Sequence, residues 1–113
     1  MKIIERPWGY YINVFEEDGF KIKKISVKIG KRLSLQTHEH RSEHWTIVKG
    51  IGKVQVGQDF NILHKNQNIY IPKNVLHRIE NIGNEELVFT EIQIGDYLGE
   101  DDIKRYEDDF GRI

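Results

Sequence analysis

The chain has 113 residues, of which 31% are charged and 38% hydrophobic, and its formal net charge is −1. This length suits one domain with one core, so we expect a single unit over residues 1–113. Basic and acidic side chains are mixed along the sequence, which argues against a nucleic-acid partner. There is no cysteine, which excludes disulfides and Cys-based metal sites, and no apolar run reaches the roughly 18 residues of a membrane span. We expect a cytoplasmic protein without a membrane partner.

Short segments of alternating hydrophobicity follow one another along most of the chain. In segment 22–29, Ile25, Val27 and Ile29 share a face with Lys23. Further runs lie at 45–50, 52–57, 60–64, 68–72, 76–81 and 86–94, separated by glycines and turn residues. With no helical pattern between them, these runs predict an antiparallel sandwich or barrel. Only residues 99–113, with acids early and Lys104 and Arg105 later, favour a short helical turn.

Histidines gather in two segments and predict a metal site. Alternation places Gln36, His38 and His40 on one face of a strand, and a turn near 41–42 then brings Glu43 inward beside Trp45. A distant strand has to supply the fourth donor, and His77 is the candidate. We therefore expect the metal ligands to be Gln36, His38, Glu43 and His77, with His40 in place of Gln36 as the alternative.

These residues resemble the paired motifs of the cupin superfamily. Gly30, Gln36, His38, Glu43 and Gly50 follow the spacing of the first cupin motif, with Gln36 in place of its first histidine. Pro72, Asn74, His77 and Asn81 follow the second motif, with Asn74 in place of glycine. The segments RPWGYY, KRLSLQTHEHRSEHW, YIPKNVLHRIEN and IQIGDYLGEDDIKRYEDDFGR extend the resemblance over nearly the whole chain. They resemble the C-terminal cupin domain of type II mannose-6-phosphate isomerase/mannose-1-phosphate guanylyltransferases.

The resemblance implies an all-β cupin barrel, a double-stranded β-helix or jelly roll, with a short C-terminal helical turn. The nucleotidyltransferase domain of that family has no counterpart in the sequence, so what the resemblance implies is the isomerase half. We expect a sugar-phosphate isomerase that interconverts mannose 6-phosphate and fructose 6-phosphate through an enediolate. It would use one divalent metal ion, for which zinc is favoured and manganese, iron, cobalt or nickel are possible.

Other polar residues are candidates for handling the substrate. His40 is the first choice for moving a proton, and Glu91 shares a face with Gln93 on the last strand. The cationic residues Lys23, Arg6 and Arg78 are candidates for binding the substrate phosphate, although strand parity turns Arg78 away from the ligand face. A homodimer is expected from the small size of the barrel.

Three other functions are compatible with the same residues. The enzymatic alternative is a nucleotide-sugar isomerase or epimerase. The non-enzymatic alternative is a sugar-binding cupin module without turnover. An iron-dependent dioxygenase is a weaker third, because Gln36 stands where many such cupins have histidine.

Overall fold

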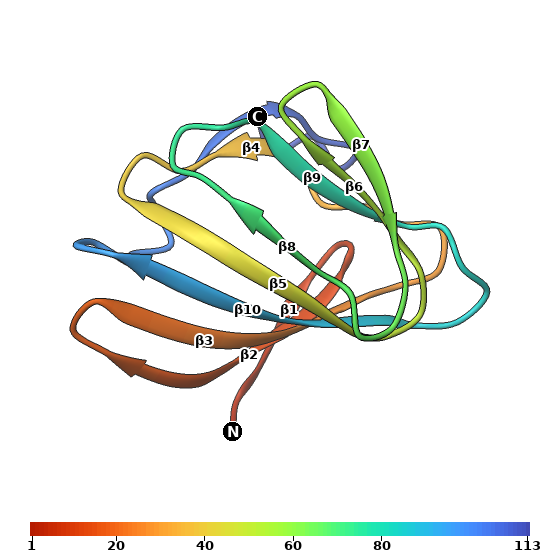
Figure 1. The fold of residues 1–113 in the computed structure, drawn as a ribbon, viewed down its shortest axis with the longest axis horizontal. Helices are drawn as coiled ribbons and strands as arrows, with labels where there is room; N and C mark the ends of the chain where they lie inside the picture. The colour runs from red at the N-terminus through yellow and green to blue at the C-terminus, as the bar shows by residue number, and fades with distance from the viewer.

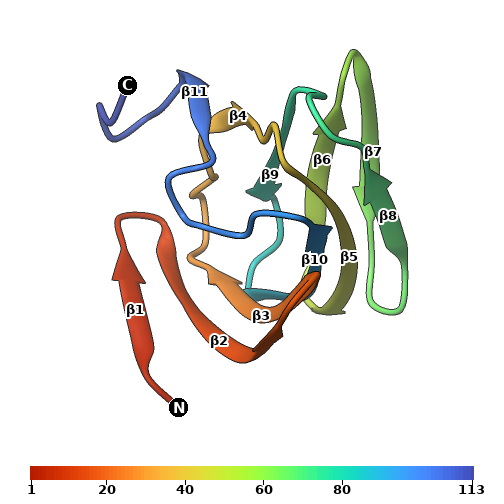
Figure 2. The same cartoon turned by 90° about the vertical axis from the view of Figure 1, so that its left-hand side faces the viewer.

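The computed structural model describes all 113 residues and consists of strands joined by turns and loops. The strands are β1 (Ile3–Arg6), β2 (Gly9–Glu17), β3 (Phe20–Val27), β4 (Leu35–Thr37), β5 (Arg41–Lys49), β6 (Gly52–Val56), β7 (Asp59–Leu63), β8 (Asn68–Ile71), β9 (His77–Asn81), β10 (Leu87–Gly95) and β11 (Lys104–Glu107). They form two antiparallel sheets that face each other, as Figures 1 and 2 show.

The larger sheet has the order β1-β2-β3-β10-β5-β8, and the smaller has the order β11-β4-β9-β6-β7. Strands distant in sequence are therefore neighbours, since β10 lies between β3 and β5. The chain passes repeatedly from one sheet to the other, as in a double-stranded β-helix. This arrangement confirms the predicted cupin fold.

The core lies between the sheets and is built from the inward-facing residue of each alternating pair. Trp45, Ile47 and Phe89 are almost fully covered, and the rings of Trp45 and Phe89 pack with their centroids 5.0 Å apart. From β9 and β6, Ile79 and Val54 complete the packing with 0% exposure. In β3 the predicted alternation holds, because Ile25 and Val27 are buried on the same face as Lys23.

At the C-terminus the structure departs from the sequence prediction. Residues 104–107 form strand β11 rather than a helical turn. The physical reason is pairing: Lys104 lies opposite Thr37 and Arg105 opposite Gln36, so β4 gains a hydrogen-bonded neighbour. Ile29 also differs from expectation, since β3 ends at Val27 and leaves Ile29 58% exposed.

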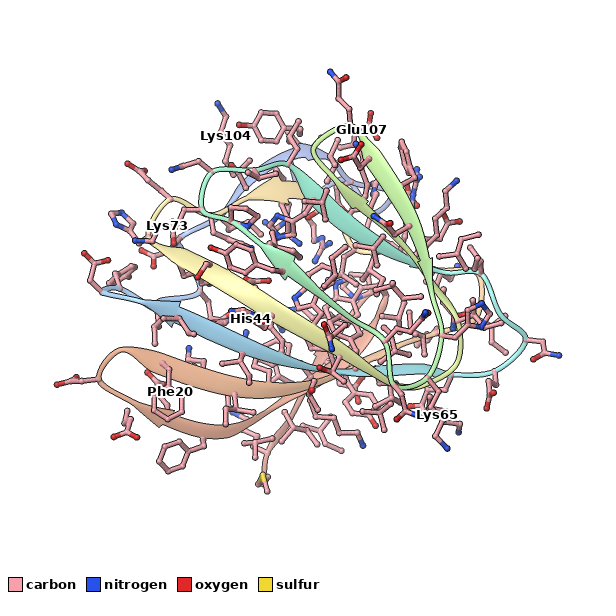
Figure 3. The ribbon with its side chains drawn as sticks, in the orientation of Figure 1. Phe20, His44, Lys65, Lys73, Lys104 and Glu107 are labelled. Carbon is pink, nitrogen blue, oxygen red and sulfur yellow. The ribbon has the colours of Figure 1, made fainter.

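Side chains fill the space between the two sheets, and others project outward from the ribbon (Figure 3). Lys73, Lys104 and Glu107 lie on the outside of the ribbon. His44 points away from the core on the outer face of β5, where its ring packs on Tyr70. No helix of sufficient length and hydrophobicity to cross a bilayer is present.

Candidate metal centre

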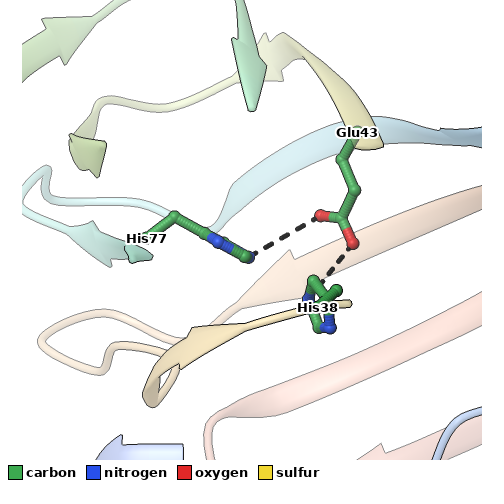
Figure 4. Close-up of side chains that lie close together, drawn as sticks. All are labelled: His38, Glu43 and His77. Atoms are coloured by element: carbon green, nitrogen blue, oxygen red, sulfur yellow. Dashed lines mark ion pairs between the residues drawn. The ribbon is translucent and has the colours of Figure 1, made fainter. Parts of the chain in front are cut away.

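Three buried side chains from three strand ends converge between the sheets (Figure 4). His38 follows β4, Glu43 lies on β5, and His77 begins β9. Nε2 of His38 lies 3.3 Å from Oε2 of Glu43, and Nε2 of His77 lies 4.0 Å from Oε1 of the same carboxylate. Their potential ligand atoms all lie within 4.8 Å of one another. Two segments separated by more than thirty residues thus meet at one carboxylate, as the sequence pattern predicted.

Hydrogen bonds to main-chain carbonyls fix the orientation of both imidazoles. Nδ1 of His38 lies 2.7 Å from the carbonyl oxygen of Asp102, and Nδ1 of His77 lies 2.9 Å from that of Val75. A carbonyl can only accept, so each Nδ1 carries the hydrogen and each Nε2 presents a lone pair. A carbonyl partner of this kind typically orients a metal-binding histidine.

Burial keeps both imidazoles neutral near pH 7. Loss of solvent, followed by the nearby Arg41 charge, lowers the pKa of His38 to about 3. Burial likewise lowers the pKa of His77 to about 4. Neutral imidazoles are the form that binds metal.

The Glu43 carboxylate, which is 1% exposed, is held by two donors. Nε1 of Trp45 donates to its Oε1 at 3.0 Å, and Nε of Arg41 donates to its Oε2 at 2.7 Å. The same Arg41 places Nη2 3.3 Å from Nε2 of His38. Nε and Nη2 lie on the same edge of the guanidinium, so this edge faces both Glu43 and His38, and a metal ion that used the His38 lone pair would have to displace Nη2.

Gln36 lies beside the three converging residues. It is buried, and it is the residue of β4 that pairs directly with His77 of β9. Directly opposed residues of an antiparallel pair point to the same face, so Gln36 and His77 both face the interior. The structure therefore brings the four predicted ligands to the same region.

Two features of these side chains fit a divalent ion: an unpartnered nitrogen atom and the spacing of the ligand atoms. Nε2 of His77 is buried and has no hydrogen-bond partner, although its lone pair faces Glu43. Ligands about 2.1 Å from a tetrahedral ion lie roughly 3.4 Å apart, close to the 3.3 Å between His38 and Glu43. Two imidazoles and a carboxylate are a donor set used for zinc and other divalent transition metals.

A cavity of about 120 Å³ opens next to this cluster. Its lining residues are Arg6, Trp8, Tyr11, Lys23, Ile25, Leu33, Ser34, Gln36, His38, Arg41, Glu43, Glu91, Glu100, Ile103, Arg105 and Arg112. The volume suits an ion with a few waters, so a larger ligand would project through the mouth.

Glu91 faces this cavity from β10, as the sequence predicted. Its carboxylate accepts hydrogen bonds from Nε1 of Trp45 at 3.0 Å and from Nε2 of Gln93 at 2.7 Å. Burial, and then the charge of Glu43, raises the pKa of Glu91 to about 7.

The other predicted site residues are divided between the cavity and the outside. Arg6 and Lys23 line the cavity, and Nζ of Lys23 forms an ion pair with Glu100 at 2.8 Å. Arg78 lies on the opposite side of β9, where it donates to the carbonyl of Leu33 and pairs with Glu107 at 2.9 Å. The parity argument thus placed Arg78 as the structure does.

His40 is not part of the cavity wall. Because β4 ends at Thr37, the alternation that would turn His40 inward stops before it. Its side chain is 46% exposed and contacts Tyr97, with ring centroids 5.8 Å apart. The structure therefore does not bring His40 together with the four predicted ligands.

Two residues of the site were not identified from the sequence. Arg41 was assigned to a turn, but it is the first residue of β5 and faces inward. Arg41 alternates with Glu43 and Trp45 along the strand, and this pattern could have predicted that its side chain faces inward. Glu100, in the loop after β10, had no such signal, because the ion pair with Lys23 links residues 77 positions apart.

Two facing antiparallel sheets with a His-Glu-His group between them define a cupin with a possible metal site. The cupin domain of Schizosaccharomyces pombe Cnp3 superimposes with a TM-score of 0.74 over 77% of this chain and 64% of that structure, at 19% identity, which supports the fold. Residues 1–108 match the family described as mannose-6-phosphate isomerase C-terminal, and the chain belongs to this family.

Curated bacterial relatives are similar to nearly the whole chain. The xanthan biosynthesis protein XanB of Xanthomonas campestris is 48% identical over 96% of this chain and 23% of its own length. A mannose-1-phosphate guanylyltransferase of Escherichia coli K12 is 43% identical over 97% of this chain and 23% of its own length. The chain therefore spans less than a quarter of the length of these relatives.

These relatives correct the predicted activity. The sequence analysis expected an isomerase of mannose 6-phosphate and fructose 6-phosphate, and this prediction is wrong. Relatives that are named by their reaction are mannose-1-phosphate guanylyltransferases, which are transferases. The error has a simple origin: a barrel with a metal-type donor set is compatible with many functions, and the resemblance to a two-activity family supplied the choice between them.

Proposed function

We propose that this chain is a divalent-metal-binding cupin module that binds a carbohydrate ligand in a system for guanylyl transfer to mannose 1-phosphate. The observation that carries the proposal is the convergence of two imidazole lone pairs on Glu43, one of them, on His77 Nε2, buried without a partner. The names of the relatives support the choice of carbohydrate.

His38, Glu43 and His77 would hold the ion, and Gln36 would add an amide oxygen. Neutral nitrogen donors with one carboxylate favour zinc, while manganese, iron, cobalt and nickel suit the same donors. One anionic ligand leaves a divalent ion with net positive charge, which would orient and polarise a hydroxyl or carbonyl oxygen of the carbohydrate.

The remaining polar groups of the cavity would bind the rest of the ligand. The carboxylate of Glu91 is held by Trp45 and Gln93, so it is fixed in position to accept a hydrogen bond from a sugar hydroxyl. The apolar faces of Trp8 and Tyr11, which also line the cavity, suit the C–H face of a sugar ring. These contacts orient a ligand without requiring turnover.

Metal binding is the first test. The purified protein should be stripped with a chelator, and the binding of zinc, manganese, cobalt and nickel measured by calorimetry and elemental analysis. We expect one ion per chain in the wild type and loss of binding in His77→Ala. His44→Ala, an exposed imidazole on the outer face of β5, is the matched control and should retain the metal. Equal metal retention in the two variants would contradict the proposed site.

Carbohydrate binding is the second test. Mannose 1-phosphate should be titrated into the metal-loaded and the metal-stripped protein. Tighter binding to the loaded protein is expected, because the ion contributes ligand contacts. Identical affinities in the two states would show that the metal is not part of the carbohydrate site.

A further inference from the structure

The outer face of the larger sheet has almost no charged side chains at its centre. Strands β10 and β5 lie side by side there (Figure 1), and alternation turns every second residue of each strand away from the core. Their outward residues include Thr90, Ile92, Ile94, His44, Thr46 and Val48. The first lysine among the outward residues of these two strands is Lys49, the last residue of β5, where its Nζ lies 3.7 Å from Glu86. The charge therefore lies at the end of the sheet and not at its centre.

Five neighbouring strands contribute one residue each to a row across this face. Tyr70 of β8 lies opposite His44 of β5, and His44 lies opposite Ile92 of β10. Ile92 in turn lies opposite Ile22 of β3, and Ile22 lies opposite Phe15 of β2. Opposed residues of antiparallel strands point to the same side, so the row is continuous. Tyr70 is 52% exposed, Phe15 49% and Ile92 37%.

The outer face of the smaller sheet is different. There Lys53 of β6 lies opposite Glu80 of β9, and Arg78 pairs with Glu107. The whole chain is 31% charged, so its composition does not account for a sheet face without charge. An antiparallel sheet that faces water normally turns polar side chains outward. Aromatic and aliphatic side chains without charge are instead typical of the core of a protein interface.

The size of the face suits a stable contact between two proteins. Strands β2, β5 and β10 have nine residues each, β3 has eight and β8 has four. With about 3.4 Å per residue and about 4.8 Å between strands, these five strands cover roughly 640 Å². Projecting side chains increase the accessible area, which therefore approaches the roughly 800 Å² that each partner buries in a standard interface.

A second copy of the chain fits this face. A face that recognised a charged partner would carry complementary charges, whereas two uncharged faces meet without repulsion. Two antiparallel sheets pack about 10 Å apart with their strands within about 30° of each other, as in a β-sandwich. The same face can serve both copies in a two-fold dimer. Ile92 lies on the middle strand of the row, so it would lie at the centre of such a contact.

We propose that two copies of the chain form a dimer by packing the outer faces of their larger sheets together, with the row from Tyr70 to Phe15 at the centre. This inference goes beyond the proposed function and does not rest on it. Glu43 and His44 are neighbours on β5 but point to opposite sides of the sheet, so the dimer does not require an occupied metal site.

The first test is the mass of the protein in solution as a function of concentration. Sedimentation of the wild type should give twice the chain mass of 13.4 kDa at high concentration. Dilution should return the monomer, with a Kd of about 1 µM or tighter. Ile92→Lys and Tyr70→Lys should raise this Kd roughly 100-fold or more, because the dimer would bury charges without partners.

Ile62→Lys is the matched control for Ile92→Lys. Ile62 is an exposed isoleucine on β7, opposite Lys53 on the outer face of the smaller sheet. It should dimerise as the wild type does, and circular dichroism and metal content should be the same in all variants. Dimers of unchanged Kd in Ile92→Lys and Tyr70→Lys would overturn the proposed interface.

The second test locates the contact directly. The chain has no cysteine, so Ile92→Cys and Ile62→Cys each introduce a single thiol. Reaction of the Ile92→Cys thiol with a maleimide should slow as the protein concentration rises, because the dimer covers this position. The Ile62→Cys thiol should react at the same rate throughout. Equal rates for Ile92→Cys at every concentration would overturn the inference. A wild type that stays monomeric would also overturn it and leave the face to a different protein.

Discussion

His38 and Asp102 are joined by a hydrogen bond from the imidazole Nδ1 to the main-chain carbonyl oxygen, 2.7 Å long. The Asp102 side chain holds this carbonyl in place, since its two oxygens accept the backbone N–H groups of Glu39 at 2.9 Å and His40 at 3.0 Å. The loop after β10 is thereby fixed to the end of β4. Asp102 thus acts on the metal site only through His38, as a positioning residue.

Asp102→Asn should weaken metal binding. The amide keeps one acceptor oxygen but presents N–H groups to a backbone donor, so the carbonyl that orients His38 is no longer held. Loss of such an outer partner commonly lowers metal affinity roughly 10- to 100-fold. Competition with a chromogenic chelator measures the change, and Asp101→Asn, at the neighbouring exposed position, is the control. Wild-type affinity in Asp102→Asn would show that the loop does not position His38.

Glu43→Gln should abolish metal binding and destabilise the fold. The substitution removes the anionic ligand and leaves the buried Arg41 guanidinium without its charge partner. Breaking a buried ion pair from one side costs about 3–5 kcal/mol. Urea denaturation measures the loss, and added zinc should raise the melting temperature of the wild type but not that of the variant.

A second substitution distinguishes the two effects of Glu43→Gln. Glu43→Gln combined with Arg41→Met removes both charges, so most of the lost stability should return while metal binding stays absent. Equal stability of the single and double variants would show that the ion pair with Arg41 is not the source of the loss.

Alternation along the strands was sufficient to predict the inward-facing residues of the fold. Glu43 was placed inside because it shares parity with Trp45 and Ile47, and the structure has all three at 1% exposure. The same reasoning turned Lys23 inward. These predictions succeed because a period of two is a property of the strand itself and needs no knowledge of the partner strand.

Strand ends and long-range pairs could not be predicted in the same way. His40 was expected on the ligand face, but β4 ends three residues earlier, and nothing local marks this end. Arg105 was expected in a helical turn, because its charge pattern suits a helix end; pairing with Gln36, far away in sequence, makes it a strand instead. The carbonyl of Asp102 has no sequence signal, since every residue has one.

Phe89→Ala should cost about 3–5 kcal/mol in the free energy of unfolding. Phe89 is fully buried, and its ring packs on Trp45, whose indole N–H binds both Glu43 and Glu91. The cavity left behind would therefore also loosen the metal site. Urea denaturation measures the cost, and Ile92→Ala on the outer face of β10, 37% exposed, should change stability by much less. Similar costs for the two variants would contradict the assignment of the core.

The stability of the protein should fall in acid through Asp108. Hydrogen bonds from Arg112 lower the pKa of this carboxyl from 3.8 to about 2, and its side chain is fully covered. A carboxyl with a lowered pKa in the folded state stabilises the fold at pH values above its unfolded pKa. That contribution is lost as the pH falls from about 4 to about 2, because the folded state then has to take up the proton.

Asp108→Asn should be less stable than the wild type at pH 5, and the difference should shrink toward pH 2. Urea midpoints at each pH measure this, and Arg112→Gln should give the same profile, because it removes the other half of the pair. A difference between wild type and Asp108→Asn that stays constant from pH 5 to pH 2 would show that the pair with Arg112 does not set this acid response.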